Sequence, residues 1–190
     1  MFSQIQRLIG WGFILFFLWE PPALGTFAPE IDNRAEVRAL YLYNLLLFVE
    51  WPDRLPLKDD PFCILVVGDD SMYEKIQRLD EKRVQGRKLM IRRWGEDRKI
   101  PPGCSVCYIG ASKIDMAPQL LKKLKGEGIL TVSEMEGFTE MGGMVQFKNI
   151  SGETKPNSKR FKINLTAVKR EGLKIRARVL RLADIVYGPE

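Results

Sequence analysis

The three cysteines are the residues whose type and spacing most directly suggest chemistry, and two of them, Cys104 and Cys107, form a CxxC motif. A redox-active CxxC motif needs a helix N-terminus, where the thiolate is stabilised. Here the motif opens the apolar run CSVCYIG, which is typical of a buried strand. Three residues along a strand span about 10 Å and their side chains point to opposite faces, so we do not expect Cys104 to bridge Cys107.

Cys63 stands at the start of another apolar run, FCILVV, which also predicts a buried strand. If the two strands are neighbours in a parallel sheet, Cys63 and Cys104 occupy similar heights along it. We therefore predict a structural Cys63–Cys104 disulfide and a buried free thiol at Cys107.

Other chemistry is limited because none of the 190 residues is a histidine. Nucleophilic sites of the Ser-His-Asp and Cys-His types and His-ligated metals are thereby removed. There is no GxGxxG, GxxxxGK[ST] or GxSxG motif, and Glu50, Glu134 and Glu136 are not paired at a usable spacing. We predict no catalytic residues, no metal and no cofactor, although carboxylate chemistry is not excluded.

The run Gly68-Asp69-Asp70 resembles the acidic pair of phosphoacceptor receiver domains, which need a further Asp at the end of the third strand. That strand ends here without an acid, at Ile109-Gly110-Ala111-Ser112. We therefore interpret the run as a helix start, with Asp70 or Ser71 as the cap.

The first 25 residues have the pattern of a secretory signal peptide. Arg7 precedes the uncharged stretch 8–19, which as a helix is about 18 Å long and too short to cross a bilayer. Prolines 21 and 22 and the small residues up to Gly25 follow. We predict cleavage near Gly25 and a mature domain over 26–190 that lies outside the cytoplasmic membrane; the alternatives are an uncleaved anchor or a buried helix. Export favours the disulfide, because that compartment is oxidising.

Hydrophobic periodicity predicts strands that alternate with helices at short spacing. We expect strands over 62–67, 88–94, 104–109, 129–132, 144–147 and 159–163, and helices over 34–50, 70–79, 112–125, 165–171 and 175–186. This order predicts an α/β fold, a single-domain sandwich of a mainly parallel β-sheet flanked by helices, with a possible antiparallel edge strand.

Charge is concentrated near the end of the chain. Residues 155–181 contain ten basic residues and one acid, Glu171. In the expected last helix Lys174, Arg178 and Arg181 share one face. This face is either simply solvated or docks onto an acidic partner surface or anionic lipid head groups. An exported protein seldom meets nucleic acid, so we predict no nucleic-acid partner.

Candidate partner- or ligand-binding residues are polar or amphipathic groups in apolar surroundings, namely Asn44, Glu50, Trp51 and Asn164, together with Arg178 and Arg181. Structural roles are the alternative. Asn44 would then satisfy a buried backbone group, Glu50 and Trp51 would cap and pack the helix end, and Asn164 would start the next helix.

Taken together, the segments resemble one family. ALYLYNLLLFVEWP (39–52) is similar to the opening signature of the YfiR family of exported proteins. The order of later segments agrees: FCILVVGDD, VQGRKLMIRR, CSVCYIGAS, ILTVSEMEGFTEMGGMVQF and FKINLTAVKREGLKIRARVLRLADIV. The resemblance spans about residues 35 to 186.

The resemblance implies a periplasmic, non-enzymatic regulator that represses a membrane diguanylate cyclase by engaging its periplasmic portion. It also implies a domain that tends to form a homodimer and responds to redox state and small molecules. The family's bridge between first-strand and third-strand cysteines falls on Cys63 and Cys104. A second disulfide of some members has no cysteines here, and Arg176-Ala177 stands where two serines are usual.

Two functions from different classes follow. In the first, the protein represses a membrane signalling enzyme and is released by a ligand or by disulfide reduction, which raises cyclic-di-GMP. In the second, it is a small-molecule-binding module serving a transporter or histidine kinase, with its ligand at the carboxyl ends of the strands.

Overall fold

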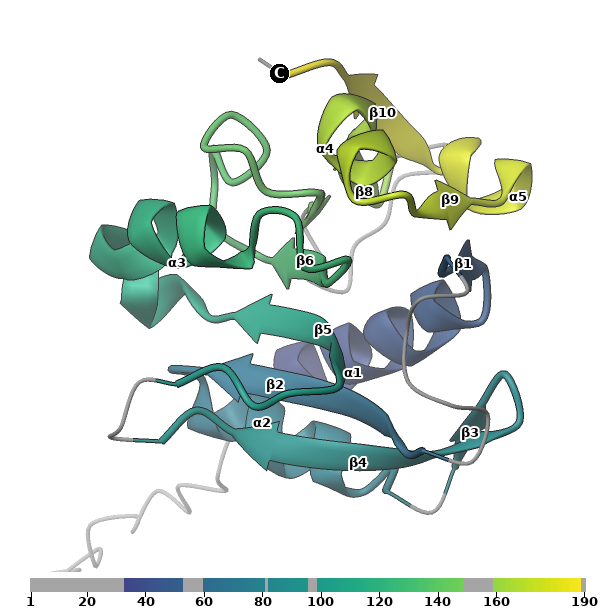
Figure 1. Ribbon diagram of the computed structural model, residues 1–190, viewed down its shortest axis with the longest axis vertical. Helices are drawn as coiled ribbons and strands as arrows, with labels where there is room; N and C mark the ends of the chain where they lie inside the picture. The colour runs from purple at the N-terminus through teal and green to yellow at the C-terminus, as the bar shows by residue number, and fades with distance from the viewer. Residues whose placement is uncertain (1–32, 53–59, 81, 96–98, 149–158, 189–190) are drawn as a thin grey trace, which may run out of the picture. The chain divides into compact units, whose positions relative to one another are not determined.

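The computed structural model describes residues 33–52, 60–80, 82–95, 99–148 and 159–188, all within one compact unit (Figure 1). The predicted signal peptide lies outside the described residues, so its cleavage stays a prediction. Within them, no helix is both long and apolar enough to cross a membrane.

An eight-stranded sheet forms the centre of this unit, with strand order β10-β8-β7-β6-β5-β2-β4-β3 (Figure 1). Antiparallel pairing joins β3 to β4 and β7 to β8, and the other neighbours are parallel. The predicted α/β fold with a mainly parallel sheet is thus confirmed. The strands are β2 (Phe62–Val67), β3 (Arg83–Val84), β4 (Arg87–Arg93), β5 (Cys104–Ile109), β6 (Leu130–Ser133), β7 (Val145–Phe147), β8 (Phe161–Asn164) and β10 (Ala183–Val186).

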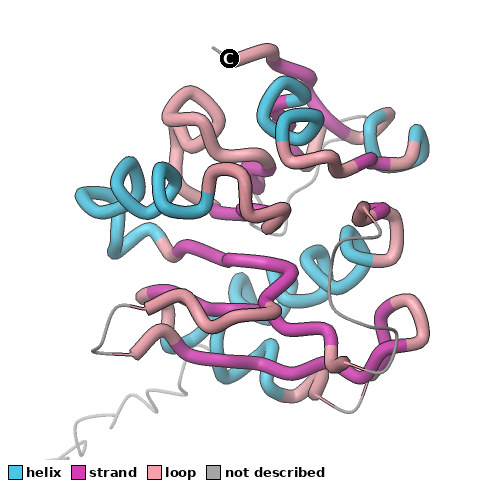
Figure 2. Tube along the Cα trace, in the orientation of Figure 1, coloured by secondary structure: helices cyan, strands magenta, loops and turns pink. Residues whose placement is uncertain are grey.

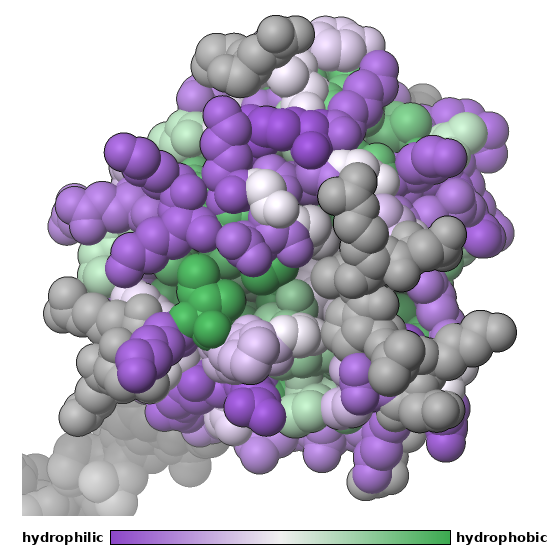
Figure 3. Space-filling model, in the orientation of Figure 1, coloured by the Kyte–Doolittle hydropathy of each residue, from purple (hydrophilic) through white to green (hydrophobic). Residues whose placement is uncertain are grey.

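Helices cover the sheet on both faces because the central strands are apolar on both. The alternate β2 residues Phe62, Ile64 and Val66 pack in one cluster with α1 (Asn33–Leu46) and α2 (Asp70–Gln77). Cys63, Leu65 and Val67 pack in a second cluster with α3 (Ala117–Leu124). In Figure 3, which views the side that carries α3, hydrophilic side chains cover most of the surface and hydrophobic ones gather over β5.

Two predicted helix starts need correction. Asp69, not Asp70 or Ser71, caps α2, and its carboxylate accepts a hydrogen bond from Met72 N at 2.8 Å. Gly68 has a positive φ of 69°, so the chain turns one residue earlier than expected. The helix expected over 112–125 is divided, because Lys113 leaves helical geometry and the 3₁₀ segment η1 (Ala111–Met116) precedes α3.

The expected helix over 34–50 is also too long. It ends at Leu46, and β1 (Val49–Glu50) pairs antiparallel with β9 (Lys174–Ile175) in a separate two-stranded sheet.

The expected last helix over 175–186 is wrong. This stretch contains the end of β9, the single-turn helix α5 (Ala177–Leu180) and strand β10, which pairs parallel with β8 (Figure 2). Pairing with β8 satisfies the backbone of 183–186 and overrides an apolar spacing that also fits a helix. Lys174, Arg178 and Arg181 therefore do not form a helical stripe. The expected helix over 165–171 is present as α4 (Leu165–Arg170).

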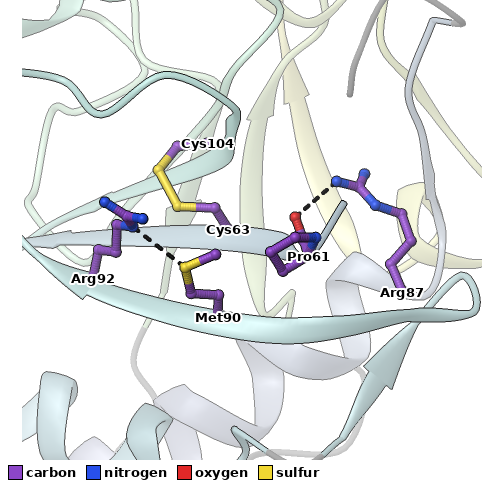
Figure 4. The surroundings of a disulfide bond; sticks show 6 residues. All are labelled: Pro61, Cys63, Arg87, Met90, Arg92 and Cys104. Atoms are coloured by element: carbon purple, nitrogen blue, oxygen red, sulfur yellow. Dashed lines mark hydrogen bonds between the residues drawn. A yellow bond between two sulfur atoms is a disulfide. The ribbon is translucent and has the colours of Figure 1, made fainter. Parts of the chain in front are cut away.

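The predicted Cys63–Cys104 disulfide is present, with a Cα–Cα distance of 4.4 Å (Figure 4). Cys107 is a buried free thiol. The register pairs Cys63 with Cys104 but Ile64 with Val106, which leaves Ser105 as a bulge. This extra residue places Cys104 and Cys107 in the same apolar cluster. The expectation that they face opposite sides is therefore wrong.

We predict that replacing both disulfide cysteines by alanine lowers the free energy of unfolding. The bridge closes a separation of 41 residues, for which chain entropy alone gives about 4 kcal/mol. Urea unfolding at pH 7 measures the change, and adding reductant to the unsubstituted protein should reproduce it. Cys107→Ala is the matched control and should keep its response to reductant. Equal stability of the double variant and the oxidised protein would contradict the prediction.

Candidate functional site

An exposed stripe is formed by Leu40 and Asn44 of helix α1 and by Leu47 in the turn directly after it, at spacings of i, i+4 and i+7. Leu40 is 49% exposed and Leu47 is 36% exposed, while the opposite face of the helix is buried against the sheet. Asn44 is exposed, so it does not satisfy a buried backbone group. The stripe is an apolar surface with one polar residue at its centre.

Arginines stack on aromatic rings beside this stripe. The Cζ atom of Arg178, on α5, lies 5.6 Å from the ring centroid of Phe48. The Cζ atom of Arg160 lies 5.5 Å from the ring centroid of Tyr41. Stacking of this kind orients a guanidinium while leaving its edge available to a carboxylate.

The antiparallel pair β1–β9 holds the basic end of the chain against α1. Arg176 N donates to Phe48 O at 2.9 Å, and Arg176 Nε lies 2.9 Å from Glu50 Oε1. The ion pair is half exposed and contributes little to stability, so its effect is mainly to position Arg176. We call the assembled region the arginine–aromatic surface, made of Leu40, Tyr41, Asn44, Leu47, Phe48, Glu50, Arg160, Arg176 and Arg178.

The Trp51 side chain makes contacts within the fold. Its Nε1 donates to Ser105 O at 3.3 Å, and its ring meets Phe62 edge-to-face with centroids 5.0 Å apart. Trp51 therefore packs the end of the sheet beside the bulge.

Asn164 is buried, and its side chain makes three hydrogen bonds. Its Oδ1 accepts from Ala167 N at 3.0 Å, which caps α4, and from Gly188 N at 3.2 Å. Its Nδ2 donates to Thr139 O at 3.1 Å. Asn164 thus joins α4, the loop after β6 and the segment after β10.

Arg181 follows α5 and is exposed, and its carbonyl accepts a hydrogen bond from Lys159 Nζ at 2.7 Å. The structure therefore brings Asn44, Glu50 and Arg178 together on the arginine–aromatic surface and leaves Trp51 and Asn164 inside the fold. Reasoning from sequence missed Tyr41, Phe48, Arg160 and Arg176, although the basic run and the helical spacing were signals for them.

A crevice for ligands is expected where the strand order reverses, at the carboxyl ends of β2 and β5. Side chains of the protein occupy this place. Arg38 Nη1 lies 3.2 Å from Glu134 Oε1 and 3.8 Å from Asp69 Oδ2. The Tyr108 hydroxyl donates a hydrogen bond to Glu134. Burial is the main cause that raises the pKa of Tyr108 well above its ordinary value, and the negative charge of Glu134 raises it further. Glu134 is thus bound by Arg38 and Tyr108, two residues far from it in the sequence.

Two cavities lie elsewhere. One of about 320 Å³ reaches the disulfide, where Arg92 Nε lies 3.3 Å from Met90 Sδ (Figure 4). Its lining is formed by Asp60, Pro61, Cys63, Met90, Arg92, Pro102 and Gly103. The other, of about 520 Å³, is lined by Thr166, Lys169, Arg170 and Tyr187. The described residues include no cluster of three His, Cys, Asp or Glu side chains able to hold a metal ion.

The model of the YfiR/HmsC-like family matches residues 35–184. The chain belongs to the YfiR/HmsC-like family. The match runs from the first turn of α1 into β10, so the whole arginine–aromatic surface lies within the YfiR/HmsC-like region. The family assignment from sequence is confirmed.

Cys107 of this YfiR/HmsC-like chain is expected to be chemically inert. Burial raises the pKa of its thiol to about 12, so roughly one molecule in ten thousand carries a thiolate at pH 8. We predict no reaction of the native protein with Ellman's reagent over minutes at pH 8, and one thiol per chain after denaturation in urea without reductant. Rapid labelling of the native protein would contradict this environment.

Asn164→Ala should destabilise this YfiR/HmsC-like domain by about 2–4 kcal/mol, because a cap and two further hydrogen bonds are lost in a buried position. Asn164→Asp keeps an oxygen that accepts from Ala167 N and Gly188 N, and we expect it to lose less. Urea unfolding of both variants at pH 7 provides the comparison. A loss below about 0.5 kcal/mol for the alanine variant would show that Asn164 does not join these segments.

Proposed function

We propose that this protein is an exported, non-enzymatic regulator that binds the periplasmic portion of a membrane diguanylate cyclase and represses it. Membership in the YfiR/HmsC-like family supports the class of function. The observation that carries the proposal is the arginine–aromatic surface, where exposed Leu40 and Leu47 lie beside two arginines stacked on aromatic rings.

The composition of this surface suits a protein partner. Arginine and aromatic residues are enriched where protein interfaces gain most of their energy. Arg160 and Arg178 are already oriented by Tyr41 and Phe48, so binding would immobilise them at a reduced entropic cost. The complementary partner surface would be acidic around an apolar centre.

Repression requires the regulator to bind the inactive state of the cyclase more tightly than the active state. Release by disulfide reduction has a physical route. Cys104 is followed by Ser105, whose carbonyl accepts from Trp51 Nε1, and Trp51 directly follows Glu50 of the arginine–aromatic surface. A backbone shift at the bulge would therefore reach that surface in few steps.

The alternative, a small-molecule-binding module for a transporter or histidine kinase, is less favoured. The expected ligand crevice at the carboxyl ends of β2 and β5 is occupied by Arg38, Glu134 and Tyr108. Cavities elsewhere leave room for an effector of a regulator. The homodimer expected from the resemblance stays a prediction.

We predict that Arg178→Glu weakens partner capture at least about 10-fold, because it reverses the charge of one of the stacked arginines of the arginine–aromatic surface. Tagged protein purified from the periplasm would be mixed with detergent-solubilised membranes, and the captured proteins identified by mass spectrometry. Oxidised and reduced samples would be compared to separate a regulatory from a purely structural disulfide.

Lys122→Glu is the matched control, since Lys122 is exposed on α3 and belongs to the other face of the sheet. Capture of a diguanylate cyclase by the unsubstituted protein and by Lys122→Glu, with loss for Arg178→Glu, supports the proposal. A histidine kinase or transporter in place of the cyclase supports the alternative. Equal capture by the two variants excludes this surface.

A further inference from the structure

The cavity of about 520 Å³ beside α4 has a lining suited to an anion. Thr166, Lys169 and Arg170 come from α4, and Tyr187 comes from the segment after β10. Each of these side chains carries a hydrogen-bond donor, two are cations, and none of the lining residues named is an acid. The volume lies within the range of small-molecule sites.

Arg170 is held in position before any ligand binds. Its Nε lies 3.1 Å from Glu171 Oε1, and the Glu171 side chain is fully buried. Glu171 Oε2 accepts from Gly126 N at 2.8 Å and from Gly128 N at 3.2 Å. These contacts fix the carboxylate, and the carboxylate in turn fixes one edge of a guanidinium whose side chain is 26% exposed.

The two sides of the cavity are joined by Asn164. Its Oδ1 accepts from the first turn of α4 and from Gly188, the neighbour of Tyr187. A Cβ atom added at Gly188 would lie 2.4 Å from Asn164 Nδ2, so the two residues are closely packed. The spacing between α4 and the backbone that carries Tyr187 is therefore set by the fold.

We propose that this cavity binds the phosphate group of a phosphate monoester. A phosphate monoester carries close to two negative charges and three acceptor oxygens, which match two cations and two hydroxyl groups. A carboxylate has one charge and two oxygens and would leave part of this donor set unused. Tyr187 is 74% exposed, and its ring offers a surface against which the organic part of the ligand packs.

Two sources supply this chemistry, a soluble phosphate monoester and phosphatidic acid, the phospholipid whose head group is itself a phosphate monoester. The site shares no residue with the arginine–aromatic surface, and the inference does not depend on the identity of the membrane partner. Its test can therefore fail while the proposed function stands.

The experiment titrates the purified full-length exported protein with glycerol 3-phosphate by calorimetry at physiological salt. In parallel, the protein is sedimented with vesicles of pure phosphatidylcholine, or of phosphatidylcholine containing either phosphatidic acid or, as a phosphodiester control, phosphatidylglycerol. Binding of glycerol 3-phosphate supports a soluble ligand, and sedimentation with phosphatidic acid in preference to phosphatidylglycerol supports a head group. Absence of both overturns the proposal.

Variants localise the binding. Lys169→Gln and Thr166→Val should each reduce affinity for the probe, by about 10-fold or more for the lysine because a charge-assisted hydrogen bond is lost. Lys122→Gln removes the same charge on α3 and should leave affinity unchanged. Thermal unfolding checks that each variant is folded. Equal affinity of Lys169→Gln and the unsubstituted protein, or equal losses for Lys169→Gln and Lys122→Gln, would contradict a site at this cavity.

Discussion

The burial of β2 and β5 on both faces is the constraint on which the rest of the structure depends. All six residues of each strand are buried, so neither face can remain uncovered without exposing a large apolar area. The helices α1 and α2 cover one face and α3 covers the other. The bulge at Ser105 and the Cys63–Cys104 disulfide adjust the same strand pair at one end.

The arginine–aromatic surface is formed by elements that the sheet already requires. Helix α1 packs one face against the sheet, and its other face, with the turn that follows it, exposes Leu40, Asn44 and Leu47. The chain then returns after β8 through β9 and α5, and pairing of β9 with β1 places a strongly basic segment beside α1. The basic residues that are close together in the sequence therefore lie beside an exposed apolar stripe in the fold.

The long strands could be predicted because FCILVV and CSVCYI are unbroken apolar runs, and the disulfide followed from placing those runs side by side. The pieces after Gly172 could not, because elements of two to four residues carry too little periodicity to distinguish strand from helix. The bulge at Ser105 has no sequence signal, so the pattern alone places Cys104 and Cys107 on opposite faces although both lie in one apolar cluster. The network of Arg38, Glu134 and Tyr108 could not be predicted from the sequence, because it joins residues from three segments that are distant in the chain.

The central claim is that the arginine–aromatic surface contacts a membrane signalling protein, and in-cell crosslinking tests it most directly. A photoreactive amino acid would replace Leu47, which is 36% exposed at the centre of that surface, and in a second strain Lys122 on α3. After irradiation of intact cells, we expect the probe at position 47, and not the one at 122, to form a covalent adduct with a membrane diguanylate cyclase. Adducts with that cyclase from position 122 alone, or none from position 47 in cells where the cyclase is repressed, would contradict the account.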